Sequence, residues 1–292
     1  MSHPYYNKLI AAAFALLSFY ANAQDVIPTK GREFWVGFMQ NYANEPQQES
    51  LDIFITSDQS TNGIVEIPQL GWSTNFTVTA NQTTTVTVPN SLAEHYSSEI
   101  VESKGVRIAT ADTVSVFAIN FNAYSADGTK VLPVPSLGTD YRISSYPGQF
   151  YGSELVIVAT EDDTEIEITP TSNTAGGNIA GQPFTVQLNR GESYQVKASS
   201  GTGDLTGTRI VATENSGECR PFAVFSGTGC ANVYSACGAC DHIFDQNFPV
   251  KTWGREFFTV PFSFANGYTY RVLAHQDNTV VTIDNGLPIG LN

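Results

Sequence analysis

Hydrophobic and polar residues alternate at every second position over many short stretches of the chain. The clearest example is a pair of stretches on either side of the turn-forming sequence EDDT, where the alternating apolar residues are Val156, Val158, Ile166 and Ile168. Alternation with a period of two is typical of a β-strand that faces a core on one side and water on the other. Long amphipathic helical patterns are not visible. The sequence therefore predicts an all-β protein with antiparallel hairpins.

Three stretches share one arrangement of proline, glycine and aromatic residues. Each has a proline, then a glycine, then an aromatic residue three positions further on, and a strand-like run follows. The prolines are Pro28, Pro133 and Pro249, and the aromatic residues are Phe34, Tyr141 and Phe257. Self-similarity at a spacing of about 105 to 116 residues is the signature of tandem units.

The repeat predicts a unit at 24–132, a second at 133–248, and the start of a truncated third at 249–292. Residues 106–119 resemble 208–225 in the same register. About six or seven strands per unit is the size of one antiparallel β-sandwich, so we predict tandem sandwich-like repeats. A β-propeller with two blades per repeat is the alternative. The truncated third unit predicts further domains downstream.

Residues 1–23 have the pattern of a secretory signal peptide. Lys8 precedes an apolar run at 9–20, and Ala21-Asn22-Ala23 is a small-residue cleavage site. No other apolar segment approaches the ~20 residues that a membrane-spanning helix needs. We predict export, with a mature chain that begins at Gln24.

The chain carries a large excess of acidic residues. Lys and Arg number 14 against 28 Asp and Glu, which gives a net charge of −14. Such a surface repels nucleic acid and anionic lipid. We therefore exclude nucleic-acid binding as a function and expect the acidic surface to serve solubility.

All four cysteines fall within one short segment: Cys219, Cys230, Cys237 and Cys240. In an exported protein an even number of cysteines predicts two disulfides, for which three pairings exist. A zinc site formed by Cys230, Cys237, Cys240 and His242 is the rival. We favour disulfides, because the compartment is oxidising and a structural zinc site usually joins two well-separated ligand pairs.

The segment around the cysteines also carries a family motif. The sequence RPFAVFSGTGC, followed by CDHIFDQNFPVKTWG, resembles the N-terminal domain of the IgGFc-binding protein family. Besides Cys230, Cys240 and Pro249, the matching residues are Ser226, Gly227, Asp241, His242, Gln246, Trp253 and Gly254. The resemblance implies a secreted or surface-displayed extracellular module. It also implies that Cys230 pairs with Cys240, which leaves Cys219 with Cys237.

The polar residues of the chain include few candidates for catalysis or metal binding. Asp241 beside His242 is the best acid–base candidate, but neighbours on a strand point to opposite faces, so a structural role for His242 is favoured. The acidic tip 161–163 lacks the ligand series of a calcium loop, and the glycine-rich stretch 201–207 lacks the ending of a phosphate loop. We predict no enzyme activity, no cofactor and no metal.

An aromatic-rich stretch follows the second proline motif and is the candidate binding surface. Its members are Tyr141, Tyr146, Phe150 and Tyr151. Tyrosine rings with one solvent-exposed edge are suited to contacts with glycans or proteins. Packing between units is the competing interpretation of this stretch, and its position favours packing.

These observations predict a secreted or cell-surface module that binds or adheres without catalysis. An extracellular glycoprotein, mucin or glycan is the expected ligand class. The alternative is a glycan-binding accessory region of a larger surface enzyme.

Overall fold

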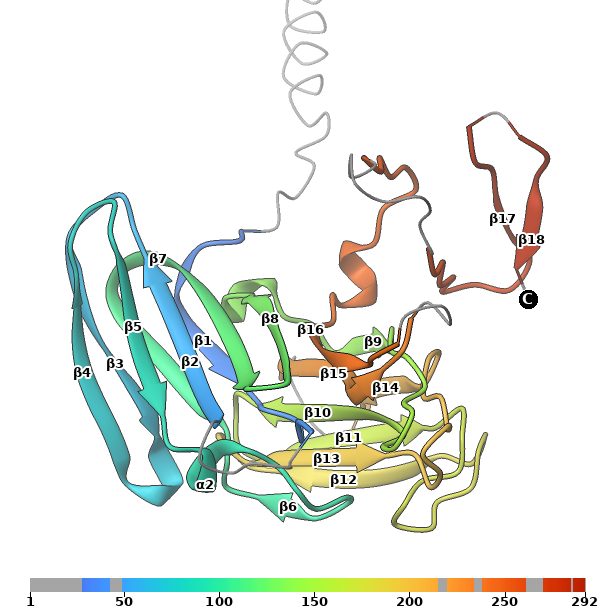
Figure 1. Ribbon diagram of the computed structural model, residues 1–292, viewed down its shortest axis with the longest axis horizontal. Helices are drawn as coiled ribbons and strands as arrows, with labels where there is room; N and C mark the ends of the chain where they lie inside the picture. The colour runs from blue at the N-terminus through green and yellow to red at the C-terminus, as the bar shows by residue number, and fades with distance from the viewer. Residues whose placement is uncertain are drawn as a thin grey trace, which may run out of the picture.

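The regular structure of the protein is almost entirely β-strand (Figure 1). The computed structural model describes residues 28–42, 49–214, 220–233, 238–260, 270–284 and 286–291. All paired strands are antiparallel, so the predicted all-β antiparallel fold is confirmed. Within these residues no helix is long and apolar enough to cross a bilayer. The predicted signal peptide lies outside the described residues.

The first half of the chain forms one seven-stranded sheet. Its strands are β1 (Gly31–Val36), β2 (Glu49–Thr56), β3 (Thr61–Ile67), β4 (Trp72–Val78), β5 (Thr83–Val88), β7 (Val106–Asn122) and β8 (Ser125–Val131). β7 pairs with β1 and β3 through its first part and with β2 and β8 through its second part, so the sheet folds over on itself. The edge strands β4 and β5 approach each other, which leaves the sheet nearly closed (Figure 1).

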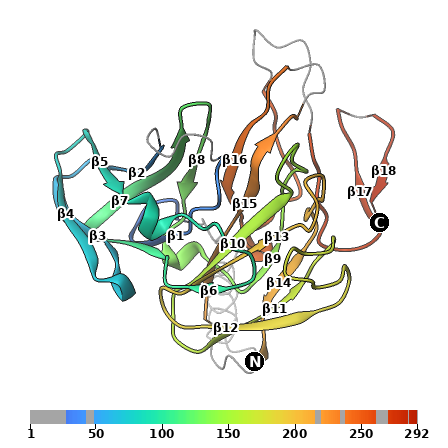
Figure 2. The ribbon, with the colours of Figure 1, turned by 60° about the horizontal axis from the view of Figure 1, so that its bottom comes forward.

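The second half, joined by the short strand β6 from the first half, forms two facing sheets. The five-stranded sheet has the order β16-β15-β10-β13-β6, and the four-stranded sheet has the order β12-β11-β14-β9. Their strands are β6 (Val101–Glu102), β9 (Asp140–Arg142), β10 (Ser153–Ala159), β11 (Thr164–Thr169), β12 (Phe184–Leu188), β13 (Ser193–Lys197), β14 (Arg209–Ala212), β15 (Phe222–Ala231) and β16 (Asp241–Gln246). The two sheets enclose one apolar core, and Figure 2 shows this half beside the first. Facing sheets around a core form a sandwich, not propeller blades.

β10 lies between two cores, which the alternating pattern did not predict. Leu155 and Ile157 face the core of the second half, whereas Val156 and Val158 pack into the core of the first half. All seven residues of β10 are buried, and so are all ten of β15. The expectation of a half-buried β10 is therefore wrong. The expectation is right for β11, where Ile166 and its alternate neighbours are buried and the residues between them are partly exposed.

The two halves pair their strands in the same order. In the first half, the first part of β7 lies in the order β4-β3-β7-β1, and its second part lies in the order β5-β2-β7-β8. In the second half it is β12-β11-β14-β9 and β13-β10-β15-β16. The registers agree as well: Phe34 pairs with Ile108 in the first half, and Tyr141 pairs with Ile210 at the same place in the second.

We propose from this correspondence that 24–132 and 133–248 are two copies of one unit. Phe34 and Tyr141, the aromatic residues of the proline–glycine–aromatic motif, are both fully buried, as expected if they occupy the same position in two copies. Phe257 is 77% exposed and does not share that environment. Beyond it, the third segment contains only a two-stranded hairpin among the described residues, formed by β17 (Thr279–Val281) and β18 (Ile289–Leu291).

Candidate functional site

The aromatic residues predicted to bind a ligand fall in different environments. Tyr141 is fully buried in the core of the second half. Its hydroxyl donates to the Phe222 carbonyl oxygen over 2.7 Å and accepts from the Gly138 amide over 2.9 Å. A side chain without exposure cannot contact a ligand in solution, so the prediction of a binding role is wrong for Tyr141. Its role is packing at the start of the second half.

Tyr146 is covered on one ring face. The guanidinium of Arg271 lies 4.0 Å from the centroid of the Tyr146 ring, a cation–π contact. The same guanidinium contacts the Asp204 carboxylate over 3.1 Å. Tyr146 therefore links the second half to the third segment of the chain, and a ligand would meet only its remaining exposed edge.

Phe150 and Tyr151 form an aromatic cluster with Tyr42. The centroid of the Tyr42 ring lies 6.2 Å from that of each of the other two. Phe150 is 63% exposed, whereas the other two rings are half-buried. Sequence reasoning missed Tyr42, because it lies far from Phe150 along the chain and joins it only where the two halves pack. One exposed ring supported by two others suits an extracellular contact surface.

The aromatic cluster is anchored to β15 beside a disulfide. The Gln149 amide donates to the Cys230 carbonyl oxygen over 2.9 Å, and the Thr228 hydroxyl donates to the Tyr151 carbonyl oxygen over 3.2 Å. Cys230 is bonded to Cys240, as the family resemblance implies. Two sulfurs that bond to each other cannot both ligate zinc, so the four-ligand zinc alternative is wrong. Cys219 and Cys237 lie outside the described residues.

Replacing both Cys230 and Cys240 with alanine should lower the free energy of unfolding by about 2–3 kcal/mol, because the bridge closes a short loop in the unfolded chain. The two residues are 10 positions apart. Urea unfolding of the oxidised parent and the double variant measures the difference. Equal midpoints would show that the bridge contributes nothing to stability.

The family-motif residues hold β15, β16 and their neighbours together. The Ser226 hydroxyl donates to the Ser144 carbonyl oxygen and accepts from the Asn247 amide group, both over 2.7 Å. The Gln246 side-chain oxygen accepts from the Leu132 amide over 2.6 Å, which joins β16 to the end of the first half. These hydrogen bonds connect segments of the fold, so Ser226 and Gln246 have structural roles.

Two other motif residues, Trp253 and Gly227, also have structural roles, whereas Gly254 makes no such contact. The indole of Trp253 donates to the Phe248 carbonyl oxygen over 3.1 Å. Gly227 lies so close to β16 that any side chain there would overlap the Ile243 carbonyl oxygen. Gly254 is exposed.

Asp241 and His242 point to opposite faces of β16, as predicted from their adjacency. Asp241 is exposed and its carboxylate accepts from the Ala126 amide over 3.0 Å. His242 is buried, and its Nδ1 lies 2.9 Å from the Thr228 carbonyl oxygen. Burial lowers the pKa of His242 to about 4, so the ring is neutral at physiological pH. The geometry does not bring the two side chains together as an acid–base pair.

The other candidate chemical motifs form turns. At the acidic tip, Asp162 accepts from the Arg190 amide over 3.0 Å, and the Asp163 carbonyl oxygen accepts from the Arg220 guanidinium. In the stretch 201–207, Asp204 accepts from the Thr206 amide over 2.9 Å. The described part of the chain holds no group of three His, Cys, Asp or Glu side chains that could bind a metal ion.

A buried polar network lies where the two halves meet. Glu154 on β10 is almost fully buried, and one of its oxygens, Oε1, has no hydrogen-bond partner. Lys197 is its neighbour on β13 and donates to the Tyr96 carbonyl oxygen over 2.8 Å and to the Gln40 side chain. Burial raises the pKa of Glu154 to about 8 and lowers that of Lys197.

His95 belongs to the same network and is also fully buried. Its ring nitrogens lie 2.7 Å from the Phe38 carbonyl oxygen and 2.7 Å from the Ser193 hydroxyl. Burial lowers the pKa of His95 to about 4. Since its partners come from both halves, His95 is a structural link between them.

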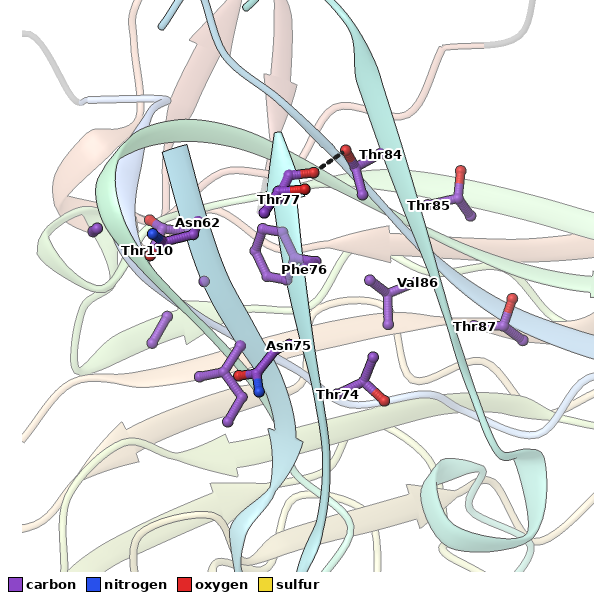
Figure 3. A pocket seen from close by; sticks show the side chains of 14 residues that line it. Asn62, Thr74, Asn75, Phe76, Thr77, Thr84, Thr85, Val86, Thr87 and Thr110 are labelled. Carbon is purple, nitrogen blue, oxygen red and sulfur yellow. Dashed lines mark hydrogen bonds between the residues drawn. The ribbon is translucent and has the colours of Figure 1, made fainter. Parts of the chain in front are cut away.

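A groove of about 920 Å³ opens between β4 and β5, at the nearly closed side of the first sheet. Figure 3 shows threonine side chains along it, with Phe76 and Val86 between them. The Thr84 hydroxyl donates to the Thr77 carbonyl oxygen over 2.7 Å and bridges the two strands. Every described side chain that lines the groove is uncharged.

Comparison with known protein families agrees with the motif. The sequence profile described as IgGFc binding protein matches residues 127–292, which is more than half of the chain. The chain belongs to the IgGFc-binding protein family. All of the motif residues lie inside the matched range, and so do Cys230 and Cys240 with the Phe150 and Tyr151 part of the aromatic cluster.

A relative within this family is the IgGFc-binding protein of Homo sapiens. The two sequences are 26% identical over 268 residues, which cover 90% of this chain but only 5% of the human protein. The likeness therefore extends over both halves described here. It concerns a small part of the much longer human member of the IgGFc-binding family.

Proposed function

We propose that this protein is a secreted or surface-displayed binding module that acts without catalysis. Residues 1–23 direct export, and the acidic, disulfide-bonded β fold presents loops to extracellular partners. Family membership supports an extracellular binding role. The partner classes to test are glycoproteins, including mucins, and the immunoglobulin Fc region named in the human relative.

The aromatic cluster is the observation that carries this proposal. Phe150 offers a large exposed ring at low entropic cost, because Tyr42 and Tyr151 hold it in place. Its main-chain neighbour Gln149 is tied to the disulfide-bonded strand. Contact surfaces in proteins commonly depend on a few such anchored aromatic residues.

Replacing Phe150 with alanine should weaken binding by about 30-fold, the effect of losing a central aromatic contact of ~2 kcal/mol. The measurement is biolayer interferometry of the secreted protein against immobilised human Fc, purified mucin and a glycan array. Ile179→Ala is the matched control, because Ile179 is also an exposed apolar residue on a loop of the second half. It should leave binding unchanged.

Absence of binding to every ligand by the parent protein would contradict the binding function. Binding that survives Phe150→Ala would instead place the contact surface away from the aromatic cluster. Thermal unfolding of each variant separates a loss of contact from a loss of fold.

A further inference from the structure

Two polar side chains of the five-stranded sheet point toward the first half of the chain. Glu154 on β10 and Lys197 on β13 are directly opposite each other in the antiparallel register. In such a pair the Cβ atoms lie about 5 Å apart on one face of the sheet. Glu154 is two residues before Val156, which packs into the core of the first half, so both side chains point to that face. A carboxyl group and an amine therefore lie side by side at the joint between the two halves.

Gln40 from the first half passes over this pair. Its main-chain amide donates to the side-chain oxygen of Gln195 over 3.3 Å, and Gln195 is two residues before Lys197 on the same face. The Lys197 amine donates to the side-chain oxygen of Gln40. Because this oxygen is bonded to Cδ of Gln40, the amine is positioned beside the carboxamide carbon.

The Glu154 carboxyl is held at the same place. It is 1% exposed, and among the described residues its Oε1 has no hydrogen-bond partner. Met39, the residue before Gln40, reaches the position of Gly227, which is opposite Glu154 on β15. Burial raises the pKa of Glu154 to about 8, so the carboxyl holds a proton at neutral pH. A buried neutral acid beside two nitrogen groups can pass a proton between them.

The Lys197 amine has neutral acceptors. It donates to the Tyr96 carbonyl oxygen over 2.8 Å and to the Gln40 side chain, and it belongs to none of the ion pairs of the described residues. A structural pair of buried charges would instead bring the Glu154 carboxylate onto the amine. Burial lowers the pKa of Lys197, which favours the uncharged amine. An uncharged lysine amine is a nucleophile.

We propose that Lys197 and Gln40 form an intramolecular isopeptide bond that joins the two halves of the chain. The lone pair of the Lys197 Nζ forms a bond to the Gln40 Cδ, the Cδ–Nε2 bond breaks, and Nε2 leaves as ammonia. One amine proton stays on the new amide, and the other passes to Nε2 through the Glu154 carboxyl, which ends as it began. The reaction needs no oxidant and no co-substrate. Contact between the two groups in the folded chain supplies the high effective concentration that such a step requires.

The bond fixes the joint from within. It links residues 157 positions apart and so closes a long loop that stays closed even when the chain unfolds. Tyr42 is two residues beyond Gln40 and belongs to the aromatic cluster with Phe150 and Tyr151. The bond therefore also anchors the segment that carries Tyr42 to the second half.

Mass spectrometry of the reduced and denatured parent protein tests the proposal without any variant. We expect an intact mass lower than the calculated mass by one ammonia. Gln24 at the predicted mature N-terminus can also lose ammonia by cyclising, so peptide mapping decides. After proteolysis, a peptide containing Gln40 should be joined to one containing Lys197. Separate, unmodified peptides for these two residues would overturn the proposal, and so would a pair joined through Glu154 with loss of water.

Lys197→Arg should give no joined peptides, because a guanidinium stays protonated and does not attack an amide. Lys104→Arg is the matched control. Lys104 is also a half-buried lysine near the joint, but its amine is ion-paired with Glu102 over 2.6 Å. This variant should form the bond as the parent does. A bond to Gln40 that persists in Lys197→Arg would contradict the assignment.

Glu154→Gln tests the proton transfer. Glutamine keeps the size of the side chain but cannot pass a proton, so in pulse-labelled cultures the bond should form at least about tenfold more slowly than in the parent. On standing, the variant should reach the same final fraction of joined peptides, because Lys197 and Gln40 still meet. Equal rates, or a final fraction below that of the parent, would overturn the role assigned to Glu154.

Discussion

Replacing Gly227 with alanine should destabilise the protein by more than about 3 kcal/mol and prevent stable folding at 37 °C. A Cβ at this position would overlap the Ile243 carbonyl oxygen, which is part of the β16 main chain and cannot rotate away. β15 and β16 would have to separate, although β15 lies in the centre of the molecule. Forced overlap in a close-packed interior costs more than most single substitutions.

Gly238→Ala is the matched control. Gly238 lies in the same disulfide-closed loop region, but an added Cβ there would meet open space. Its free energy of unfolding should stay within about 0.5 kcal/mol of the parent, as for other surface changes. Secretion yield and urea unfolding of both variants are the measurements. Equal stability of the two variants would show that β15 and β16 are not held at this spacing.

Glu154 should make the protein less stable as pH rises from about 4.5 to about 8. Its folded pKa is raised by burial, so the folded state binds a proton that the unfolded state has already released. The stabilising effect is complete below the unfolded pKa and is lost as pH rises through the folded pKa. Glu154→Gln should therefore be more stable than the parent at pH 9, by on the order of 2–3 kcal/mol, and similar to it at pH 5.

Urea unfolding at pH 5, 7 and 9 measures this difference. Glu161→Gln is the control, since Glu161 is exposed at the hairpin tip. The comparison between variants is needed because His95 and His242 act in the opposite direction: their pKa values are lowered, so their contribution is present above about 6.5 and is lost as pH falls towards 4. Parallel pH profiles of Glu154→Gln and the parent would contradict the prediction.

The alternating pattern predicts strands with one face toward solvent, but it did not identify β10 as a strand buried between the cores of the two halves. In β11, Ile166 and Ile168 alternate with glutamates, and the strand has one buried face as expected. In β10 the five residues 155–159 are all apolar. A continuous apolar run is typical of a strand buried on both faces, and this signal was present beside the alternation.

The candidate site was harder to predict, because aromatic composition does not reveal exposure. Tyr141 and Phe150 lie in one aromatic-rich stretch, yet one is a core residue and the other projects into solvent. Pairing decides the difference, since Tyr141 belongs to β9 and its ring packs on Phe222. The contribution of Tyr42 depends on packing between distant segments, and no local pattern could indicate it.

Because β10 and β15 lie between two cores, the halves are not separable pieces. A truncation near residue 133 would leave the second half with Val156, Val158 and Phe225 uncovered on one side, and it would remove the strand that protects β13. Such a fragment should precipitate or be degraded. Anyone who divides this protein for expression, fusion or display should keep 28–254 as an indivisible block and place the boundaries outside it.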